Sequence, residues 1–363
     1  MHTFEFSESF IDRFSNYLRS DHYRAAGYKK SDYWEFHAGE AQIRINGNQI
    51  TAEGGSGYYL PPQITERGRI RSVVSRLRPE WTRRKKKTNT GSELLDYFDA
   101  FDSVMAEAPV ADITRSQFRV DFAGLRSLPG VISSSGEMRE RFFAREKYGL
   151  NAHTVKAFYF SNILGGYLDP RPGRRILEIG AGSGNLAAIL FSSMDRPSYV
   201  IVDLPEILCF SILLISDLFP EAILQLPHEM GDTDVEPDFT FLTPAQMGAI
   251  PEDSVDLFIN TESFQEMTIA QIQAYFDLAN NVCKEGAYFF TSNRVEKIPN
   301  AGSNAKDTEG NIPVNRFSEY PWRRENQILV YEICRLRRLT QLDDIFIRLE
   351  QFQNEQFDAG DQI

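Results

Sequence analysis

The sequence predicts an α/β protein with a doubly wound, mostly parallel sheet that follows a smaller N-terminal region. Three observations support this fold class. Strand and helix patterns alternate from residue 174 to residue 294, three glycines at two-residue spacing follow the first strand, and two further strand patterns lie beyond residue 326. Repeated strand–helix units produce parallel strands with helices on both faces of the sheet.

The chain of 363 residues is longer than most single hydrophobic cores. We therefore divide it into an N-terminal region (1–150) and a main domain (151–363). Asp and Glu outnumber Lys and Arg by 51 to 39, and the acidic excess lies in the main domain. An acidic surface argues against nucleic-acid binding, which needs a basic footprint.

The N-terminal region is expected to be mostly helical and to contain one β-hairpin. The segment 41–62 alternates around Asn46-Gly47, a dipeptide typical of tight hairpins. Basic residues at 83–87 are expected to form a solvated loop rather than a nucleic-acid or membrane contact. Helical patterns cover residues 1–30, where Phe10, Phe14, Tyr17 and Leu18 recur at helical spacing, 92–108 and 136–168.

The elements of the main domain follow one another in strand–helix order. Pro205 suits the first turn of the second helix, and Thr268 with Gln271 fits a capping box at the start of the third. The last two strand patterns are close enough in sequence to form an antiparallel edge. The expected elements are strands at 175–180, 198–204, 238–243, 254–261, 286–294, 327–336 and 343–353, and helices at 185–194, 205–219 and 268–283.

Composition and termini predict a soluble, cytoplasmic protein. Residues 1–14 lack the basic start and apolar core of a signal peptide, and no apolar run approaches the length of a membrane span. Cys209, Cys283 and Cys334 are widely spaced, which suits a reducing compartment and gives neither a disulfide framework nor a metal motif.

The glycines after the first strand predict a ligand-binding loop. Gly180, Gly182 and Gly184 allow sharp backbone turns and close approach to a ligand. They lack the third glycine of the dinucleotide fingerprint and the Lys-Ser/Thr of a P-loop, so a pyrophosphate or triphosphate site is not indicated. Asp203 ends the second strand, where a carboxylate can accept hydrogen bonds from both hydroxyls of a ribose. The pattern therefore predicts a nucleoside site.

Glu178, the glycines and Asp203 together resemble the class I S-adenosylmethionine-dependent methyltransferases over residues 170–350. The resemblance implies a Rossmann-like, seven-stranded sheet with an antiparallel last hairpin, and S-adenosyl-L-methionine as cofactor. One departure is the lack of an acidic residue in FLTPAQ (241–246), which leaves the adenine edge to polar neighbours. The implied cofactor contacts are Glu178, Gly180, Ala181, Gly182, Gly184, Asn185, Asp203, Leu204, Thr243, Pro244, Gln246, Asn260, Thr261 and Tyr159.

A closer resemblance is to the sugar O-methyltransferase family of bacterial gene clusters. It rests on the segments IVDLPEIL (201–208), FLTPAQ (241–246), DLFINTESFQEM (256–267), TSNR (291–294), YPW (320–322) and GGSGYYLPP (54–62). It implies methyl transfer to a hydroxyl of a sugar or nucleotide-linked sugar in a biosynthetic pathway. The N-terminal region would then cap the acceptor pocket, and a homodimer is a candidate assembly.

Three residues are candidates for the base that a neutral hydroxyl acceptor needs. Glu262 and Glu266 follow the fourth strand four residues apart, so one helical turn would place both on the same face. His153 lies just upstream of the first strand, on an expected helix over the cofactor. Ion pairing and helix capping are the structural alternatives for the glutamates. Paired carboxylates also suit Mg²⁺, but no further acidic pair accompanies them, so no metal site is predicted.

Acceptor binding is assigned to the later strand ends. Asn293 and Arg294 follow the fifth strand, where the guanidinium could hold a carboxylate or phosphate or else pair with a glutamate. Tyr320 and Trp322 offer flat faces that suit sugar rings, or form a packed turn. N- or C-methylation of a natural product and a non-catalytic cofactor-binding protein are the alternative functions.

Overall fold

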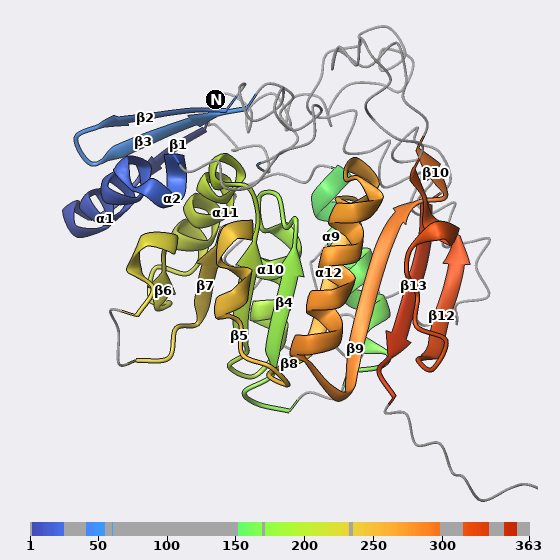
Figure 1. Ribbon diagram of the computed structural model, residues 1–363. Coiled ribbons are helices and arrows are strands. Elements are labelled where there is room, and N and C mark those ends of the chain that lie inside the picture. The colour runs from blue at the N-terminus through green and yellow to red at the C-terminus, as the bar shows by residue number, and fades with distance from the viewer. Residues whose placement is uncertain are drawn as a thin grey trace, which may run out of the picture.

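The computed structural model describes residues 2–24, 41–54, 60, 152–168, 171–231, 235–297, 315–333 and 345–353 (Figure 1). The expected helix at 92–108, the first part (136–151) of the one at 136–168, the basic run at 83–87 and Cys334 lie outside these residues. The same holds for the expected boundary near residue 150.

The main domain is built on one eight-stranded sheet. Its strand order is β12-β13-β9-β8-β4-β5-β7-β6. The pairs from β6 to β9 are parallel, whereas β13 is antiparallel to both β9 and β12. The strands are β4 (Arg175–Ile179), β5 (Ser198–Val202), β6 (Leu224–Gln225), β7 (Phe239–Leu242), β8 (Val255–Thr261), β9 (Cys283–Arg294), β12 (Gln327–Ile333) and β13 (Ile345–Gln351).

The doubly wound α/β class and the antiparallel C-terminal edge are thus confirmed. Seven strands occupy the expected places in the chain. The eighth, β6, is a two-residue strand at the edge beside β7. It is too short to leave a recognisable pattern in the sequence.

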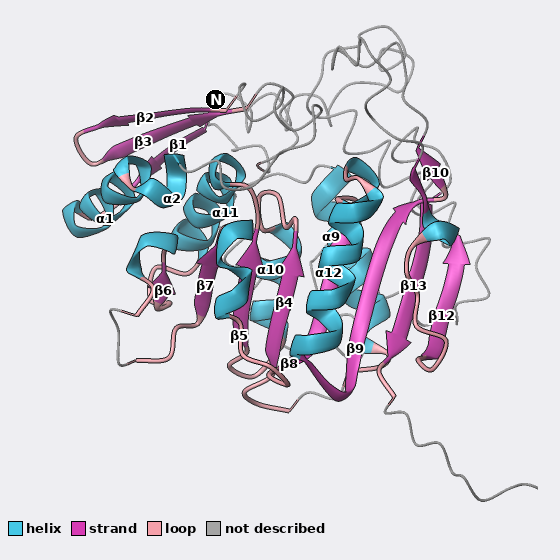
Figure 2. Cartoon of the chain, in the orientation of Figure 1, coloured by secondary structure: helices cyan, strands magenta, loops and turns pink. Residues whose placement is uncertain are grey.

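Helices cover both faces of the sheet (Figure 2). One hydrophobic cluster joins α9, α10 and α11 to one face, and a second joins α12 to the other. Neighbouring strand residues alternate between the clusters, as Ile176 and Leu177 do on β4, because successive side chains point to opposite faces. The helices are α9 (Ala152–Gly165), α10 (Asn185–Ser193), α11 (Pro205–Leu218) and α12 (Ile269–Val282).

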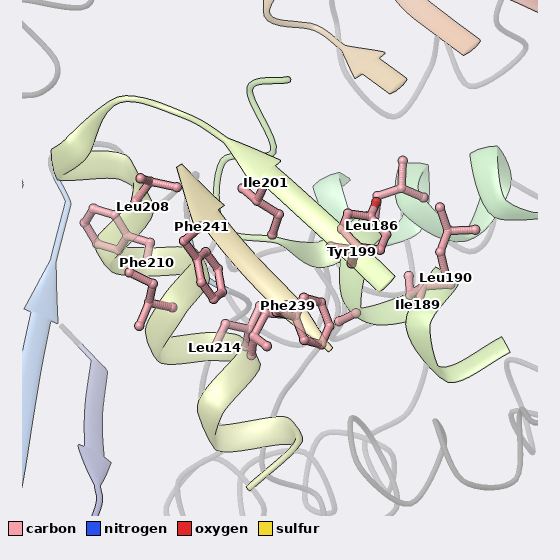
Figure 3. Close-up of a cluster of buried hydrophobic side chains, with 14 of the residues drawn as sticks. Leu186, Ile189, Leu190, Tyr199, Ile201, Leu208, Phe210, Leu214, Phe239 and Phe241 are labelled. Atoms are coloured by element: carbon pink, nitrogen blue, oxygen red, sulfur yellow. The ribbon is translucent and has the colours of Figure 1, made fainter. Parts of the chain in front are cut away.

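Figure 3 shows the first cluster, in which apolar side chains of α10 and α11 pack on β5 and β7. The expected helix starts are also present. Pro205 occupies the first turn of α11, and the side chains of Thr268 and Gln271 form a capping box at the start of α12. These local signals fix where each crossover helix begins, and therefore where each strand-end loop stops.

The described N-terminal elements form a three-stranded antiparallel sheet and two helices beside α11 (Figure 1). Phe14 and Tyr17 are fully buried and belong to the same cluster as α11. The hairpin turns at Gly47, which has a φ of +59°. The elements are β1 (His2–Glu5), α1 (Glu8–Arg19), α2 (Asp21–Arg24), β2 (Gln42–Asn46) and β3 (Gln49–Glu53).

A short antiparallel ladder completes the described structure. It joins β10 (Glu296–Lys297) to β11 (Asn315–Arg316), just beyond the end of β9. Within the ranges that the structure describes, no helix has the length and apolar character to cross a membrane.

Candidate functional site

The candidate site lies at the carboxyl ends of β4 and β8. After β4 the chain continues to β5 on one side, and after β8 it continues to β9 on the other. This reversal of direction separates the loops that leave the two strands, and open α/β sheets bind ligands at such a point. The loops that follow β4, β5, β7, β8 and β9 all leave the sheet at this edge.

The three glycines of the loop after β4 have left-handed backbones, with φ of +72°, +60° and +78° at Gly180, Gly182 and Gly184. A Cβ on Gly180 would collide with the Ser263 hydroxyl, and one on Gly184 would lie 3.2 Å from Ser211 Cβ. Among the described residues beyond its two chain neighbours, none has an atom within 4 Å of the corresponding position on Gly182. Two of the glycines therefore serve close packing within the protein, whereas Gly182 faces open space and can approach a ligand.

Asp203 lies directly against this glycine loop. Its Oδ2 accepts a hydrogen bond from Gly182 N at 2.8 Å, and its Oδ1 accepts one from Leu204 N at 2.7 Å. Burial raises the pKa of Asp203 to about 7, although the two backbone hydrogen bonds lower it. Each carboxylate oxygen retains a further lone pair. The structure thus places Asp203 beside Gly182, and the carboxylate can still accept hydroxyl hydrogen bonds.

Glu178 lies beneath the loop and is 1% exposed. Its Oε2 accepts a hydrogen bond from the Tyr199 hydroxyl at 2.6 Å. Burial raises the pKa of Glu178 to about 7, partly offset by the hydrogen bond from Tyr199. The sequence interpretation placed Glu178 among the cofactor contacts; the partner seen in the structure is Tyr199, on the neighbouring strand.

Two fully buried amides tie the strand ends together. Asn260 Nδ2 donates to Ile179 O at 3.0 Å and to Ser263 Oγ at 2.6 Å. Its Oδ1 accepts from Asn293 Nδ2 at 2.9 Å, and Asn293 Oδ1 accepts from Gln265 N at 3.2 Å. Asn260 was assigned to the cofactor and Asn293 to the acceptor, but these hydrogen bonds hold β4, β8 and β9 in register at the site.

The most unusual backbone at this edge belongs to Glu262, whose φ is +58°. Such a conformation costs on the order of 1–2 kcal/mol for a residue with a Cβ. Lys156 Nζ contacts both carboxylate oxygens of Glu262 at 2.5 Å, and Lys156 is 3% exposed. Burial would raise the pKa of Glu262, but the positive charges of Lys156 and Arg294 hold it below its usual value.

His153 joins this group from the first turn of α9, three residues before Lys156. Burial lowers the pKa of His153 to about 4, the charge of Lys156 lowers it further, and the charge of Glu262 opposes both. The imidazole is therefore neutral at pH 7. His153 and Glu262, two of the three candidate bases, are thus close enough to influence each other's pKa. The sequence interpretation did not include Lys156. Its only indication in the sequence was its position three residues after His153, which places both side chains on one face of a helix.

Glu266 lies apart from Glu262, contrary to the expected shared helical face. Glu262 precedes the helical turn and has a left-handed backbone, while Glu266 ends a short 3₁₀ helix (Phe264–Glu266). Glu266 pairs with its own lysine, Lys297. Burial lowers the pKa of Lys297 to about 8. The left-handed residue breaks the α-helical geometry on which the expectation depended.

The loop after β7 is closed by its own side chains. Gln246 Oε1 accepts hydrogen bonds from Thr243 N and Oγ1, both at 3.0 Å, in a capping box of the 3₁₀ helix Pro244–Ala249. Gln246 Nε2 donates to Pro227 O at 2.8 Å. Gln246 thus shapes the expected adenine edge. At the glycine loop, Asn185 Nδ2 donates to Ser183 Oγ at 2.7 Å, and Ala181 is partly exposed, as is Thr261 at the end of β8.

The aromatic candidates pack within the protein. The Tyr320 hydroxyl donates to Asn315 Oδ1 at 2.8 Å, and Trp322 Nε1 donates to Phe317 O at 2.9 Å. Both rings belong to the cluster between the sheet and α12, and the Arg348 guanidinium lies 4.2 Å from the Trp322 ring centroid. These residues form the packed turn that was the structural alternative. Tyr159, on α9, is 6% exposed and belongs to the cluster on the opposite face.

The remaining candidates are placed as follows. Arg294 N donates to Gln265 Oε1 at 2.8 Å, which fixes the backbone at the end of β9. Leu204 is buried at the start of α11. Among the described residues, no group of three or more His, Cys, Asp or Glu side chains could hold a metal ion.

The chain matches no protein-family model and no curated protein. Solved structures similar to it include an S-adenosylmethionine-dependent methyltransferase from Aquifex aeolicus (11% identity, 61% of this chain and 99% of that chain, TM-score 0.34). Others are the arsenic(III) methyltransferase of Chlamydomonas reinhardtii (16%, 52% and 65%, 0.34) and the phosphoethanolamine N-methyltransferase 2 of Haemonchus contortus (12%, 68% and 61%, 0.38). Similarity at this level carries no inference about the activity of this chain.

Proposed function

We propose that this protein is an S-adenosylmethionine-dependent methyltransferase that methylates a hydroxyl of a small, sugar-like acceptor. The observation that carries the proposal is the hydrogen bond between Gly182 and Asp203 at the switch point of the sheet. It sets the Asp203 carboxylate, which we propose accepts hydrogen bonds from the ribose, beside the one glycine of the loop whose Cβ position meets no atom of the described residues. The absence of a phosphate-binding motif in this loop favours a nucleoside over a dinucleotide.

The residues at this edge fit the parts of the cofactor. Asp203 would accept hydrogen bonds from the ribose hydroxyls, and the backbone of Gly180–Gly184 would lie along the methionine part. The loop at Thr243 and Pro244 would border the adenine, with Gln246 holding the shape of that loop. When bound, S-adenosylmethionine supplies a methyl group on a sulfonium, which is activated for in-line displacement.

Of the three candidates, His153 is the one that we propose as the base. Glu262 is held by Lys156 at both oxygens, and Glu266 is paired with Lys297, so both carboxylates are engaged. The His153 imidazole is neutral at pH 7 and can accept the hydroxyl proton at an unprotonated ring nitrogen. The acceptor oxygen then forms the new bond to the methyl carbon as the proton leaves. Burial and the charge of Lys156 disfavour the imidazolium that results, and the negative charge of Glu262 offsets part of this.

The choice of a hydroxyl acceptor rests on the need for this base. An amine or carbanion acceptor depends less on a general base. The loss of activity on substitution of His153 should therefore be larger for a hydroxyl acceptor than for an amine or carbanion acceptor. The sugar class rests on the resemblance of the segments IVDLPEIL (201–208) and DLFINTESFQEM (256–267) to the sugar O-methyltransferases. Arg294, at the end of β9, is the candidate contact for an acidic group on such an acceptor.

Isothermal titration calorimetry with S-adenosylmethionine and S-adenosylhomocysteine tests the cofactor site. We expect binding by the wild type, strong weakening in Asp203→Ala, and wild-type affinity in the control Asp277→Ala, whose exposed carboxylate lies on α12 on the opposite face of the sheet. Absence of binding by the wild type would overturn the proposal. Acceptors would then be screened among sugars and nucleotide-linked sugars by the formation of S-adenosylhomocysteine.

A further inference from the structure

Helix α1 of the N-terminal region is attached to the main domain by a two-pronged arginine contact. Arg13 Nε donates to Glu229 Oε1 at 2.7 Å, and one terminal nitrogen of Arg13 donates to Glu229 Oε2 at 2.8 Å. The same nitrogen donates to Leu224 O at 2.7 Å. A bidentate arginine–carboxylate pair fixes orientation as well as distance. The hydrogen bond to Glu229 raises the pKa of Arg13, and the contact with Arg13 lowers the pKa of Glu229, so both groups are charged at neutral pH.

Glu229 also bonds to the backbone of the turn that supports the expected adenine edge. Its Oε2 also accepts a hydrogen bond from Leu226 N at 2.9 Å, which closes the 3₁₀ turn Pro227–Glu229. Pro227 O in that turn accepts the hydrogen bond from Gln246 Nε2, and Gln246 holds the Thr243 backbone. An unbroken series of short polar contacts thus runs from Arg13 to the loop after β7.

A second contact from the same helix reaches the ribose side. The Tyr17 hydroxyl, fully buried, donates to Pro205 O at 2.9 Å, two residues after Asp203. The Tyr17 ring also stacks on His228, in the Pro227–Glu229 turn, with the ring centroids 6.2 Å apart. One turn of α1 separates Arg13 from Tyr17, so a single helical face touches both loops.

We propose that α1 is the positioning element for the nucleoside half of the site, with Arg13 and Tyr17 as its positioning residues. Neither residue reaches the cofactor itself; they hold the loops after β5 and β7 at the separation that a nucleoside requires. This inference rests on the proposed function. Because linkage is reciprocal, a nucleoside that binds better when α1 is docked must also tighten the docking of α1.

Hydrogen–deuterium exchange of the full chain tests the reciprocal prediction without any mutation. Saturating S-adenosylhomocysteine is expected to slow exchange of the amides of Glu8–Arg19 in addition to those of the glycine loop. Protection of the glycine loop with no change in α1 would overturn the inference and leave the cofactor site intact. Failure of the wild type to bind S-adenosylhomocysteine would instead overturn the proposed function.

Two variants test the positioning residues by affinity. Arg13→Gln and Tyr17→Phe are each expected to lower the affinity for adenosine and the affinity for S-adenosylhomocysteine by the same factor. We expect a factor of about five to ten, the lower part of the usual range for coupled sites. The control Arg19→Gln lies on the same helix, where its side chain bonds to Ser15 O and to no other described residue, and it should bind as the wild type does. A lowered melting temperature with unchanged adenosine affinity in both variants would show a merely structural contact and refute the proposal.

Discussion

Lys156 and Glu262 form an ion pair between residues 106 positions apart in the chain, with Nζ at 2.5 Å from both carboxylate oxygens and with side chains that are 4% and 16% exposed. The pair joins helix α9, which precedes the sheet, to the strained turn after β8. It therefore fixes the helix that carries His153 against the strand end where the acceptor is proposed to bind. The ion pair determines the geometry between the proposed base and the cofactor loop.

Lys156→Met is expected to destabilise the protein by about 3 kcal/mol, the lower end for a broken buried pair, because it leaves the largely buried Glu262 carboxylate without its bonded counter-charge. The double variant Lys156→Met/Glu262→Gln should recover most of that loss. Lys284→Met is the matched control: Lys284 is 42% exposed, and its partner Asp256 keeps contacts to Arg171 and Arg175 N. Urea denaturation measures the free energy of unfolding of the two single variants and of the double variant. A double variant no more stable than Lys156→Met would show that the uncompensated charge is not the cause.

Gly180→Ala is expected to cost more stability than Gly182→Ala. At Gly182 the cost is that of a left-handed residue with a Cβ, about 1–2 kcal/mol, because the space beside it is open. At Gly180 the new methyl also collides with Ser263, whose hydroxyl is held by Asn260 at 2.6 Å. Urea denaturation compares the two. Equal losses would mean that Ser263 moves aside freely, contrary to the network that holds it.

Glu178→Gln is expected to stabilise the protein increasingly as the pH rises from about 4 to about 7. The folded state raises the pKa of Glu178 to about 7, so it binds the proton more tightly than the unfolded state does. The free energy of unfolding of the wild type therefore falls over this pH range, by on the order of 3 kcal/mol. The glutamine variant has no such loss, and its side-chain oxygen can still accept the hydrogen bond from Tyr199. Asp203 is present in both proteins, so its similar titration cancels. A stability difference that does not change with pH would contradict this assignment.

Much of the fold could be predicted because it depends on local patterns. Short apolar runs located the strands, and Pro205, Thr268 and Gln271 marked where helices start. Parallel strands end at a common edge, so the proximity of the glycine loop to Asp203 followed from the strand order alone. Neither inference required knowledge of any side-chain packing.

Other parts of the site could not be predicted, because they depend on contacts between distant segments. A polar residue at a strand end can point outward to a ligand or inward to a neighbouring strand, and Asn260 and Asn293 point inward to each other. The ion pair of Lys156 with Glu262 depends on the packing of α9 against the end of β8, which the sequence alone does not show. Tyr320 and Trp322 pack against α12 and the sheet for the same reason: burial, which the sequence does not report, decides their role.

S-adenosylhomocysteine affinity is expected to rise with pH up to about 7 and then to level off. The ribose hydroxyls would donate to the Asp203 carboxylate, so binding favours its ionised form, whereas the free protein raises its pKa to about 7. Below that pKa, affinity should fall by up to about tenfold per pH unit. Calorimetry from pH 5.5 to pH 8.5 measures the profile. Asp203→Asn should remove the pH dependence, and Glu178→Gln should retain it; the reverse pattern would assign the titration to Glu178.

His153→Gln is expected to lower kcat for a hydroxyl acceptor by about 10²–10⁴-fold, the usual contribution of a general base, without changing S-adenosylhomocysteine affinity. The exposed His22→Gln on α2 is the matched control and should keep full activity. Because the pKa of His153 is about 4, the base is already unprotonated at pH 6, so wild-type kcat should stay level between pH 8 and pH 6. An ordinary histidine would lose activity over this range. A kcat loss in His153→Gln smaller than about tenfold would remove His153 as the base and favour an acceptor that needs none.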